Sequence, residues 1–248
     1  MGTELIEGLA PWPDVPFDAY GPTKALRLTR IQQLVGSFLG RNWVAIPHVT
    51  HHDDADITRL EEARANYNAV NGTRLTLVPI LMRILADALR EFPKFNASFS
   101  AAGKELVQKD YVHIGCAVDT PSGLLVPVVR DCDRKSVAAI AQEISELSEK
   151  ARTKGLSMEE MAGGCITLTS LGHIGGTYFT PIVNAPELAI LGVARARPVA
   201  APGAGGDVVW KTVLPLSLSY DHRVINGVDA AHFVRFVAQR LQDITLED

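Results

Sequence analysis

The segment Ser219–Arg223 places a carboxylate, an imidazole and a guanidinium in consecutive positions, as Asp221, His222 and Arg223. An imidazole exchanges a proton near neutral pH, so His222 is a candidate general base. The segment follows an apolar strand-like run and precedes Asn226-Gly227, which turns the chain toward a helix; catalytic residues often lie at such junctions. The residues alone leave alternatives open, because a lone histidine is often just a hydrogen-bonded polar group and the two flanking charges could form a structural ion pair.

A glycine-rich segment, Ser-Leu-Gly-His-Ile-Gly-Gly-Thr, occupies residues 170–177 directly after a strand-like run. Glycines let a backbone approach a ligand closely, which favours a binding loop. They also permit a tight connection with positive φ, which needs no ligand. Spacing does not separate the two explanations.

Histidines and carboxylates gather between His48 and Asp56. Imidazole and carboxylate together suit zinc or iron. In a strand, however, His51 and His52 would point to opposite faces of the sheet. We therefore expect a polar strand end and no metal site.

Several well-known motifs are absent: a dinucleotide-binding glycine fingerprint, a phosphate-binding loop, a serine-hydrolase elbow and a His-Glu-x-x-His zinc motif. The three cysteines, Cys116, Cys132 and Cys165, match no zinc spacing and are expected to be reduced thiols of a cytoplasmic protein. The carboxylates flanking Cys132 predict a raised thiol pKa and low reactivity.

The composition is that of a globular protein, with 248 residues, 47% hydrophobic residues and a net charge of −4. This charge gives no general attraction to nucleic acid or anionic membranes. The longest apolar runs are too short to span a bilayer, and we expect neither nucleic acid nor membrane as a partner.

The elements that must position these residues follow from hydrophobic periodicity. Residues 1–23 are rich in proline and are expected to form an extended arm or the end of a linker, followed by one domain over residues 24–248. The pattern predicts helices, with their capping residues where one is evident, at 30–42 (Thr29), 57–70 (Asp56), a third from Thr76, 136–154 (Ser136), a short turn capped by Ser157 with Glu160, and 228–244. It predicts strands at 45–52, 111–118, 124–130, 165–169, 188–194 and 208–219, with hairpins at 119–123 and 203–206. Strands and helices do not alternate regularly, so the fold class is α/β of the α+β type, with a mixed sheet flanked by helices.

At this point the sequence resembles a known family, the acyltransferases of 2-oxo acid dehydrogenase complexes. Asp-His-Arg-Val-Ile-Asn-Gly at 221–227 looks like the signature of the family. Further segments that look like family segments lie at 46–50, 55–58, 111–120, 123–128 and 180–187. The glycine-rich segment and Phe-Thr-Pro-Ile-Val-Asn-Ala-Pro-Glu are most similar to pyruvate-type members, which implies an acetyl group as cargo. The resemblance covers about residues 16 to 245.

The resemblance implies a chloramphenicol acetyltransferase-like fold with the active site between subunits of a trimer. It implies that His222 is the general base, that Thr169 stabilises the oxyanion and that Asn226 supports the site by hydrogen bonding. Family members have Ser or Thr at the position of Thr169; Thr is closer to the 2-oxoglutarate type, which blurs the substrate class. Ser170, Gly172, His173 and Gly175 of the glycine-rich segment, with His48, are the expected substrate-binding residues.

The resemblance also implies coenzyme A as a substrate, a lipoyl group supplied by another domain or protein, and no metal. The expected partners are a homotrimer with an option of higher cubic assembly, a lipoyl domain and the other components of a dehydrogenase complex. Neither a lipoyl domain nor a peripheral-subunit-binding domain is present in the chain. The end of the chain, Ile-Thr-Leu-Glu-Asp at 244–248, is poorly suited to burial in an apolar docking pocket, which predicts weakened cubic assembly.

Two alternatives remain. The first is a stand-alone coenzyme A acyltransferase of the same fold acting on another small acceptor. The second, of a different class, is a non-catalytic scaffold subunit of the core, which the presence of both His222 and Thr169 argues against.

Overall fold

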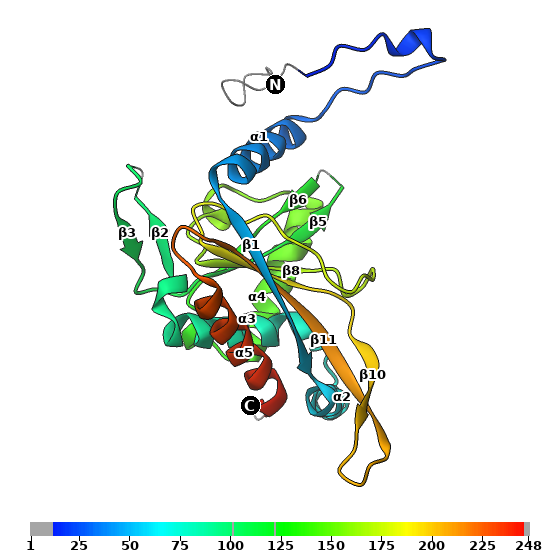
Figure 1. Cartoon of the computed structure of the whole chain (residues 1–248), viewed down its shortest axis with the longest axis vertical. Helices are drawn as coiled ribbons and strands as arrows, with labels where there is room; N and C mark the ends of the chain where they lie inside the picture. The colour runs from blue at the N-terminus through cyan, green and yellow to red at the C-terminus, as the bar shows by residue number, and fades with distance from the viewer. Residues whose placement is uncertain (1–11, 101, 122, 246–248) are drawn as a thin grey trace.

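The computed structural model describes residues 12–100, 102–121 and 123–245. A seven-stranded mixed sheet crosses the molecule in the order β1-β11-β9-β8-β4-β7, with β10 paired to β11 (Figure 1). The strands are β1 His48–Asp56, β4 Ile114–Cys116, β7 Val128–Val129, β8 Ile166–Ser170, β9 Ala189–Val193, β10 Arg197–Pro202 and β11 Val208–Asp221. β8 runs parallel to both β4 and β9, and the remaining pairs are antiparallel, which confirms the predicted mixed sheet.

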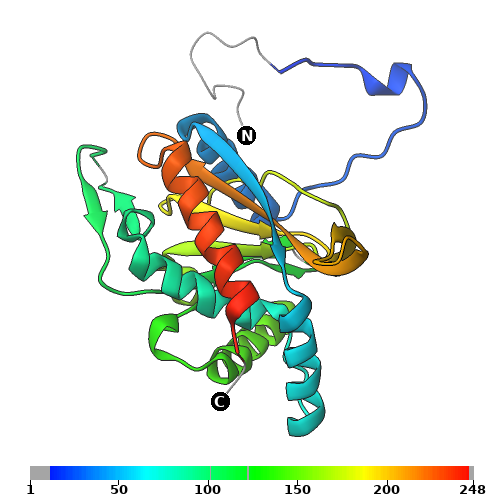
Figure 2. The same cartoon turned by 60° about the horizontal axis from the view of Figure 1, so that its bottom comes forward.

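Helices α3, α4 and α5 lie on one face of this sheet, as the two views together show (Figure 1, Figure 2). The α-helices are α1 Arg30–Ala45, α2 Thr58–Asn71, α3 Leu77–Glu91, α4 Val137–Thr153 and α5 Gly227–Asp243. Short 3₁₀ turns occupy η1 Phe17–Ala19, η2 Pro93–Phe95, η3 Cys132–Arg134 and η4 Glu159–Met161. Two small ribbons complete the described part of the chain: β2 Ala97–Phe99 with β3 Leu106–Gln108, and β5 Val118–Thr120 with β6 Gly123–Leu125.

The helix ends use the predicted side chains in most cases. Thr29 and Ser136 accept hydrogen bonds from the backbone of the first turns of α1 and α4, which satisfies amides that a helix start leaves unpaired. Asp56 Oδ1 accepts a hydrogen bond from the backbone N–H of Thr58 at 3.1 Å at the start of α2. The predicted cap Thr76 makes no such bond in α3.

α1 extends three residues further than its predicted end, so the strand predicted to begin at Ala45 begins at His48. Asn42 does not end the helix because it is buried and donates a hydrogen bond to the carbonyl of Val183 at 3.0 Å.

The core lies between the sheet and α3, α4 and α5. α3 contributes most densely, because nine of its fifteen residues are buried. In β11, Leu214, Leu216, Leu218 and Tyr220 face this core, since alternate residues of a strand point the same way. β11 is therefore held rigidly by its apolar face up to the position where its polar end begins.

The N-terminal region lies apart from this core. Residues 12–29 run away from the body as an extended arm (Figure 1, Figure 2). The predicted division into a Pro-rich arm and one following domain stays a prediction. α1 exposes an apolar stripe, Ile31, Leu34 and Phe38, which are 38%, 44% and 45% exposed, and Trp43 near the end of the helix is 61% exposed. All three tryptophans of the chain, Trp12, Trp43 and Trp210, are exposed. Residues 246–248, on which the predicted weakness of cubic docking partly depends, lie outside the described residues.

Candidate active site

His222 is the first residue after β11 and is exposed. Its backbone N–H donates to the carbonyl of Pro47 at 3.1 Å, which ties the turn to the start of β1. Its ring lies 5.8 Å from the ring of the buried Tyr220, at an interplanar angle of 31°. The imidazole therefore stands at the end of a rigid strand and is open to solvent.

Asp221 and Arg223 form an ion pair around this histidine. Arg223 Nη2 lies 2.5 Å from Asp221 Oδ2, and the backbone N–H of Arg223 donates to Asp221 Oδ1 at 3.0 Å. Asp221 is only 2% exposed, and its carboxylate raises the pKa of the Arg223 guanidinium further. The guanidinium also lies 4.6 Å from the ring centroid of Phe99. These bonds fix the backbone on both sides of His222. Asp221 and Arg223 thus form the structural ion pair that the sequence analysis considered.

Asn226 begins α5. Its side-chain oxygen accepts a hydrogen bond from the backbone N–H of Asp229 at 2.9 Å, and the Asp229 carboxylate accepts one in return from the Asn226 N–H. This reciprocal cap fixes the entry of α5 and so the length of the turn that carries His222. The predicted supporting role of Asn226 in the reaction stays a prediction.

Thr169 and Ser170 are the last two residues of β8, which is separated from β11 by β9. Ile166 and Leu168 face the core, so Thr167 and Thr169 point to the opposite face and Ser170 points to the helix side. Ser170 Oγ accepts a hydrogen bond from the backbone N–H of Gly172 at 3.3 Å, which starts the glycine-rich segment.

A cleft of about 730 Å³ opens at this end of β8. Thr169, Ser170 and His173 line it, together with the cationic side chains of Arg74 and Arg152. Gly172 and Gly175 belong to the same loop but do not line the cleft. Of the loop glycines, Gly175 and Gly176 have φ of 145° and 84°, so the turn itself needs glycine. The role of the segment in ligand binding stays a prediction.

The strand register separates Thr169 from His222 within one chain. Thr169 is level with Gly192, and Gly192 is level with Ser217 of β11. His222 lies five residues further along and two strands across. At about 3.3 Å per residue and 4.8 Å per strand, the two residues are about 19 Å apart. This distance far exceeds hydrogen-bond reach, so the two groups do not meet at one substrate atom in a single chain.

His48 bonds the backbone through both ring nitrogens. Nδ1 lies 2.8 Å from the carbonyl of Ile46, and Nε2 accepts a hydrogen bond from the Val183 N–H at 2.9 Å. The ring therefore carries its proton on Nδ1 and joins the start of β1 to the loop before β9. Trp43 stacks on it at 5.6 Å. The predicted role of His48 in substrate binding stays a prediction.

The remaining histidines of β1 do not form a metal cluster in the described part of the chain. His52 Nδ1 lies 2.9 Å from Ser217 Oγ, and its ring contacts Tyr178. No group of three or more histidine, cysteine or carboxylate side chains with the spacing of a metal site occurs within the described ranges.

The three cysteines are free and buried. Burial raises the pKa of the Cys132 thiol to about 12, with the nearby Glu143 and Asp133 as lesser causes. The predicted direction is therefore confirmed, but the main cause is desolvation and not the flanking carboxylates.

A buried carboxyl near β8 was missed by the sequence interpretation. Glu187 is 4% exposed and accepts a hydrogen bond from Thr167 Oγ1 at 2.7 Å. The signal in the sequence was a glutamate joined directly to the apolar run of β9, where a charge is unexpected.

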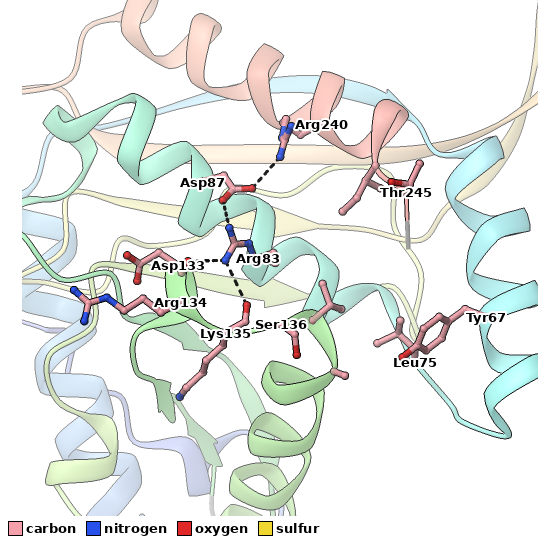
Figure 3. Close-up of a pocket in the computed structure, with 13 residues that line it drawn as sticks. Tyr67, Leu75, Arg83, Asp87, Asp133, Arg134, Lys135, Ser136, Arg240 and Thr245 are labelled. Carbon is pink, nitrogen blue, oxygen red and sulfur yellow. Dashed lines mark hydrogen bonds and ion pairs between the residues drawn. The ribbon is translucent and has the colours of Figure 1, made fainter. Parts of the chain in front are cut away.

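A second cavity, of about 430 Å³, lies between α3, α5 and η3 (Figure 3). Asp87 bridges Arg83 and Arg240 there, at 2.7 and 3.1 Å. Arg83 also donates to the carbonyl of Asp133 at 2.7 Å. None of the predicted site residues lines this cavity, and its charged groups join α3 to α5 and to η3.

Across the described residues, no helix combines the length and apolar character that crossing a membrane requires.

Comparisons with known proteins agree on one family. The model of the 2-oxoacid dehydrogenases acyltransferase (catalytic domain) matches residues 20–246. The chain is 50% identical over 242 residues to the dihydrolipoyllysine-residue acetyltransferase component of the pyruvate dehydrogenase complex of Pseudomonas aeruginosa, which covers 96% of this chain and 44% of that protein. The chain thus spans less than half the length of that curated relative.

Solved structures agree with this match. The structure of Azotobacter vinelandii dihydrolipoamide acetyltransferase, studied for the role of a serine, a histidine and an asparagine in its catalytic mechanism, has a TM-score of 0.91 and 49% identity, covering 95% of this chain and 98% of that one. The cubic core of the pyruvate dehydrogenase multienzyme complex gives the same values. Chloramphenicol acetyltransferase, at 14% identity and a TM-score of 0.53 over 82% of this chain and 94% of its own, shares the fold.

Proposed function

We propose that this chain, which belongs to the 2-oxoacid dehydrogenase acyltransferase family, transfers an acetyl group between a dihydrolipoyl thiol and coenzyme A. The observation that carries the proposal is the exposed imidazole of His222 at the fixed end of β11, within a chain about half identical to acetyltransferase components of pyruvate dehydrogenase complexes. In the relative from Azotobacter, the histidine and asparagine of its mechanism are four residues apart, as are His222 and Asn226.

The proposed chemistry begins with His222, which takes the proton from the thiol of coenzyme A. The thiolate attacks the carbonyl carbon of acetyl-dihydrolipoamide, and a tetrahedral intermediate with a negative oxygen forms. The hydroxyl of Thr169 donates a hydrogen bond to this oxygen, an effect typically worth about 3–4 kcal/mol. Collapse of the intermediate expels the lipoyl thiolate, which takes the proton from His222 and leaves acetyl-coenzyme A.

The charges of the cleft support coenzyme A as one substrate. Arg74 and Arg152 line the same cleft as Thr169 and provide positive charge for the phosphates of coenzyme A. The acetyl cargo rests on the pyruvate-type relatives, because a thioester carbonyl alone does not select chain length.

The assembly that this mechanism needs is a homotrimer or a larger particle built from it. Since about 19 Å separates Thr169 from His222 in one chain, the base must come from one copy and the oxyanion donor from the next. The exposed apolar stripe of α1 provides a surface for such a contact. A relative that forms a cubic core supports the higher assembly. We further propose a lipoyl group supplied in trans, the other dehydrogenase components as partners, and a cytoplasmic location that suits free thiols.

The test is acetyl transfer from acetyl-coenzyme A to dihydrolipoamide, followed as the formation of acetyl-dihydrolipoamide. His222→Ala should lower kcat by about 10²–10⁴, the range of a general base. His232→Ala is the matched control, since His232 is an exposed histidine of α5, and it should leave kcat unchanged. Activity with a hydroxyl or amine acceptor and none with dihydrolipoamide would favour the stand-alone acyltransferase, and no activity with any acceptor would favour the scaffold.

A further inference from the structure

Glu187 places a carboxyl group inside the protein in a closely fitted site. The side chains of Thr167 and Asn184 both donate hydrogen bonds to it, the former at 2.7 Å. A Cβ atom added to Gly164 would lie 2.5 Å from Glu187 Oε1, so the backbone there leaves room for the carboxyl and for little else. The group is therefore held in one position.

This position is close to the proposed oxyanion donor. Thr167 and Thr169 lie on the same face of β8, and alternate residues of a strand are about 7 Å apart. The Glu187 carboxyl contacts Thr167, so it lies within about 10 Å of the Thr169 hydroxyl.

The charged and titratable groups near Glu187 do not fully compensate the negative charge of its ionised carboxylate. Lys109, from the segment between β3 and β4, donates through Nζ to the carbonyl of Gly164 at 3.3 Å, and burial lowers its pKa. No salt bridge between described residues joins Lys109 to Glu187. Cys165, immediately before β8, is a thiol whose pKa burial raises. Burial is also the largest cause that raises the pKa of Glu187, to about 7, so the carboxyl changes charge near neutral pH.

We propose that Glu187 is a positioning residue for acyl transfer, and that its protonated form is the competent one. Thr167 holds the Glu187 carboxyl in place, and Glu187 acts by its charge on the end of β8 that presents Thr169; the inference rests on the function proposed above. In its ionised form Glu187 opposes the negative charge that develops on the thioester oxygen. At about 10 Å, in a partly buried setting, this repulsion slows the reaction about tenfold. The protonated carboxyl keeps its hydrogen bond from Thr167 and removes the repulsion.

The experiment compares the pH profiles of kcat for the wild-type chain and Glu187→Gln, in the assembled protein, with acetyl-coenzyme A and dihydrolipoamide. The amide has the shape of the protonated acid and no charge. The kcat of Glu187→Gln divided by the kcat of the wild-type chain cancels every ionisation that the two chains share. The ratio should be near one at pH 6 and should rise to about ten at pH 8.5. A ratio that does not change with pH would overturn the proposal.

A second variant keeps the test decisive if Glu187→Gln does not assemble. Lys109→Met removes a cation that lowers the pKa of Glu187, so the decline of kcat at high pH should move to higher pH. An unmoved decline counts against the proposal, whereas a purely structural role of Lys109 would lower kcat equally at every pH. Failure of the proposed function gives a different result, the absence of acetyl transfer by the wild-type chain at every pH, and overturns both.

Discussion

Two inactive variants of this chain should restore activity when they are assembled together. In a His222→Ala chain the base is missing, and in a Thr169→Ala chain the oxyanion donor is missing. Because about 19 Å separates the two residues in one chain, a working site must take each from a different copy. A mixed oligomer therefore contains some sites in which both the base, His222, and the oxyanion donor, Thr169, are wild type.

The magnitude follows from counting. With equal amounts of the two chains and random assembly, half of the positions that supply the base retain His222, and half of those that supply the donor retain Thr169. About a quarter of the sites are then intact, so the mixture should reach about a quarter of the wild-type kcat per chain. The kcat of each variant alone should fall by about 10²–10³ or more, so a quarter of the wild-type kcat is easily distinguished from it.

The assay is co-expression of the two differently tagged chains, followed by acetyl transfer to dihydrolipoamide over the whole mixed population; purification through both tags removes oligomers of a single variant and should raise the share of intact sites in a trimer to about one third. A control mixes wild-type chains with His222→Ala/Thr169→Ala double-variant chains, scored over the whole mixed population. Sites shared between copies again give about a quarter of the wild-type rate, whereas sites contained in one chain give about half. Activity in the co-expressed single variants that stays at the level of each variant alone would refute the shared site.

Three further predictions concern stability. Arg223→Met leaves the buried Asp221 carboxylate without its partner and should cost roughly 2–3 kcal/mol in urea unfolding, less than for a fully buried pair because the guanidinium is half exposed; an unchanged midpoint would contradict this. Asn226→Ala should cost about 1 kcal/mol through loss of the α5 cap, while Asn226→Asp should keep it, and equal losses in both would argue against capping. The raised pKa of Glu187 means that the native state keeps a proton that the unfolded chain has already lost, so the free energy of unfolding should fall by about 3 kcal/mol between pH 4.5 and pH 7; urea unfolding of Glu187→Gln should lack this slope, and matching slopes in both chains would disprove the assignment.

Much of the fold could be predicted because local chemistry and final structure agree. Ser136 caps α4 as its position before an amphipathic run indicates, and the β10–β11 hairpin turns where glycines cluster. The boundary between α1 and β1 was predicted less well. Asn42 is a typical helix-ending residue by propensity, but its bond to Val183 is a contact between residues 141 positions apart, which no local pattern contains.

Some features of the candidate site could likewise be predicted from local sequence, and others depend on tertiary contacts. His222 stands out because charge follows an apolar strand abruptly, and the structure places it where that pattern indicates. The bonds of His48 and the burial of Glu187 depend on the loop before β9 folding back onto β1 and β8, so their sequence neighbours give little sign of them. The distance between Thr169 and His222 depends on strand order and register, which the sequence pattern leaves undetermined.

The positions of the three tryptophans make intrinsic fluorescence a probe of association between chains. Trp12, Trp43 and Trp210 are 80%, 61% and 67% exposed, on the arm, α1 and the β10–β11 hairpin. A lone chain should therefore fluoresce at the long wavelength of hydrated indole even when its core is fully folded. Contact between copies along α1 would dry the indole of Trp43 and shift the emission to the blue. The intrinsic tryptophan emission of this protein thus reports on the association of chains more than on the folding of the core.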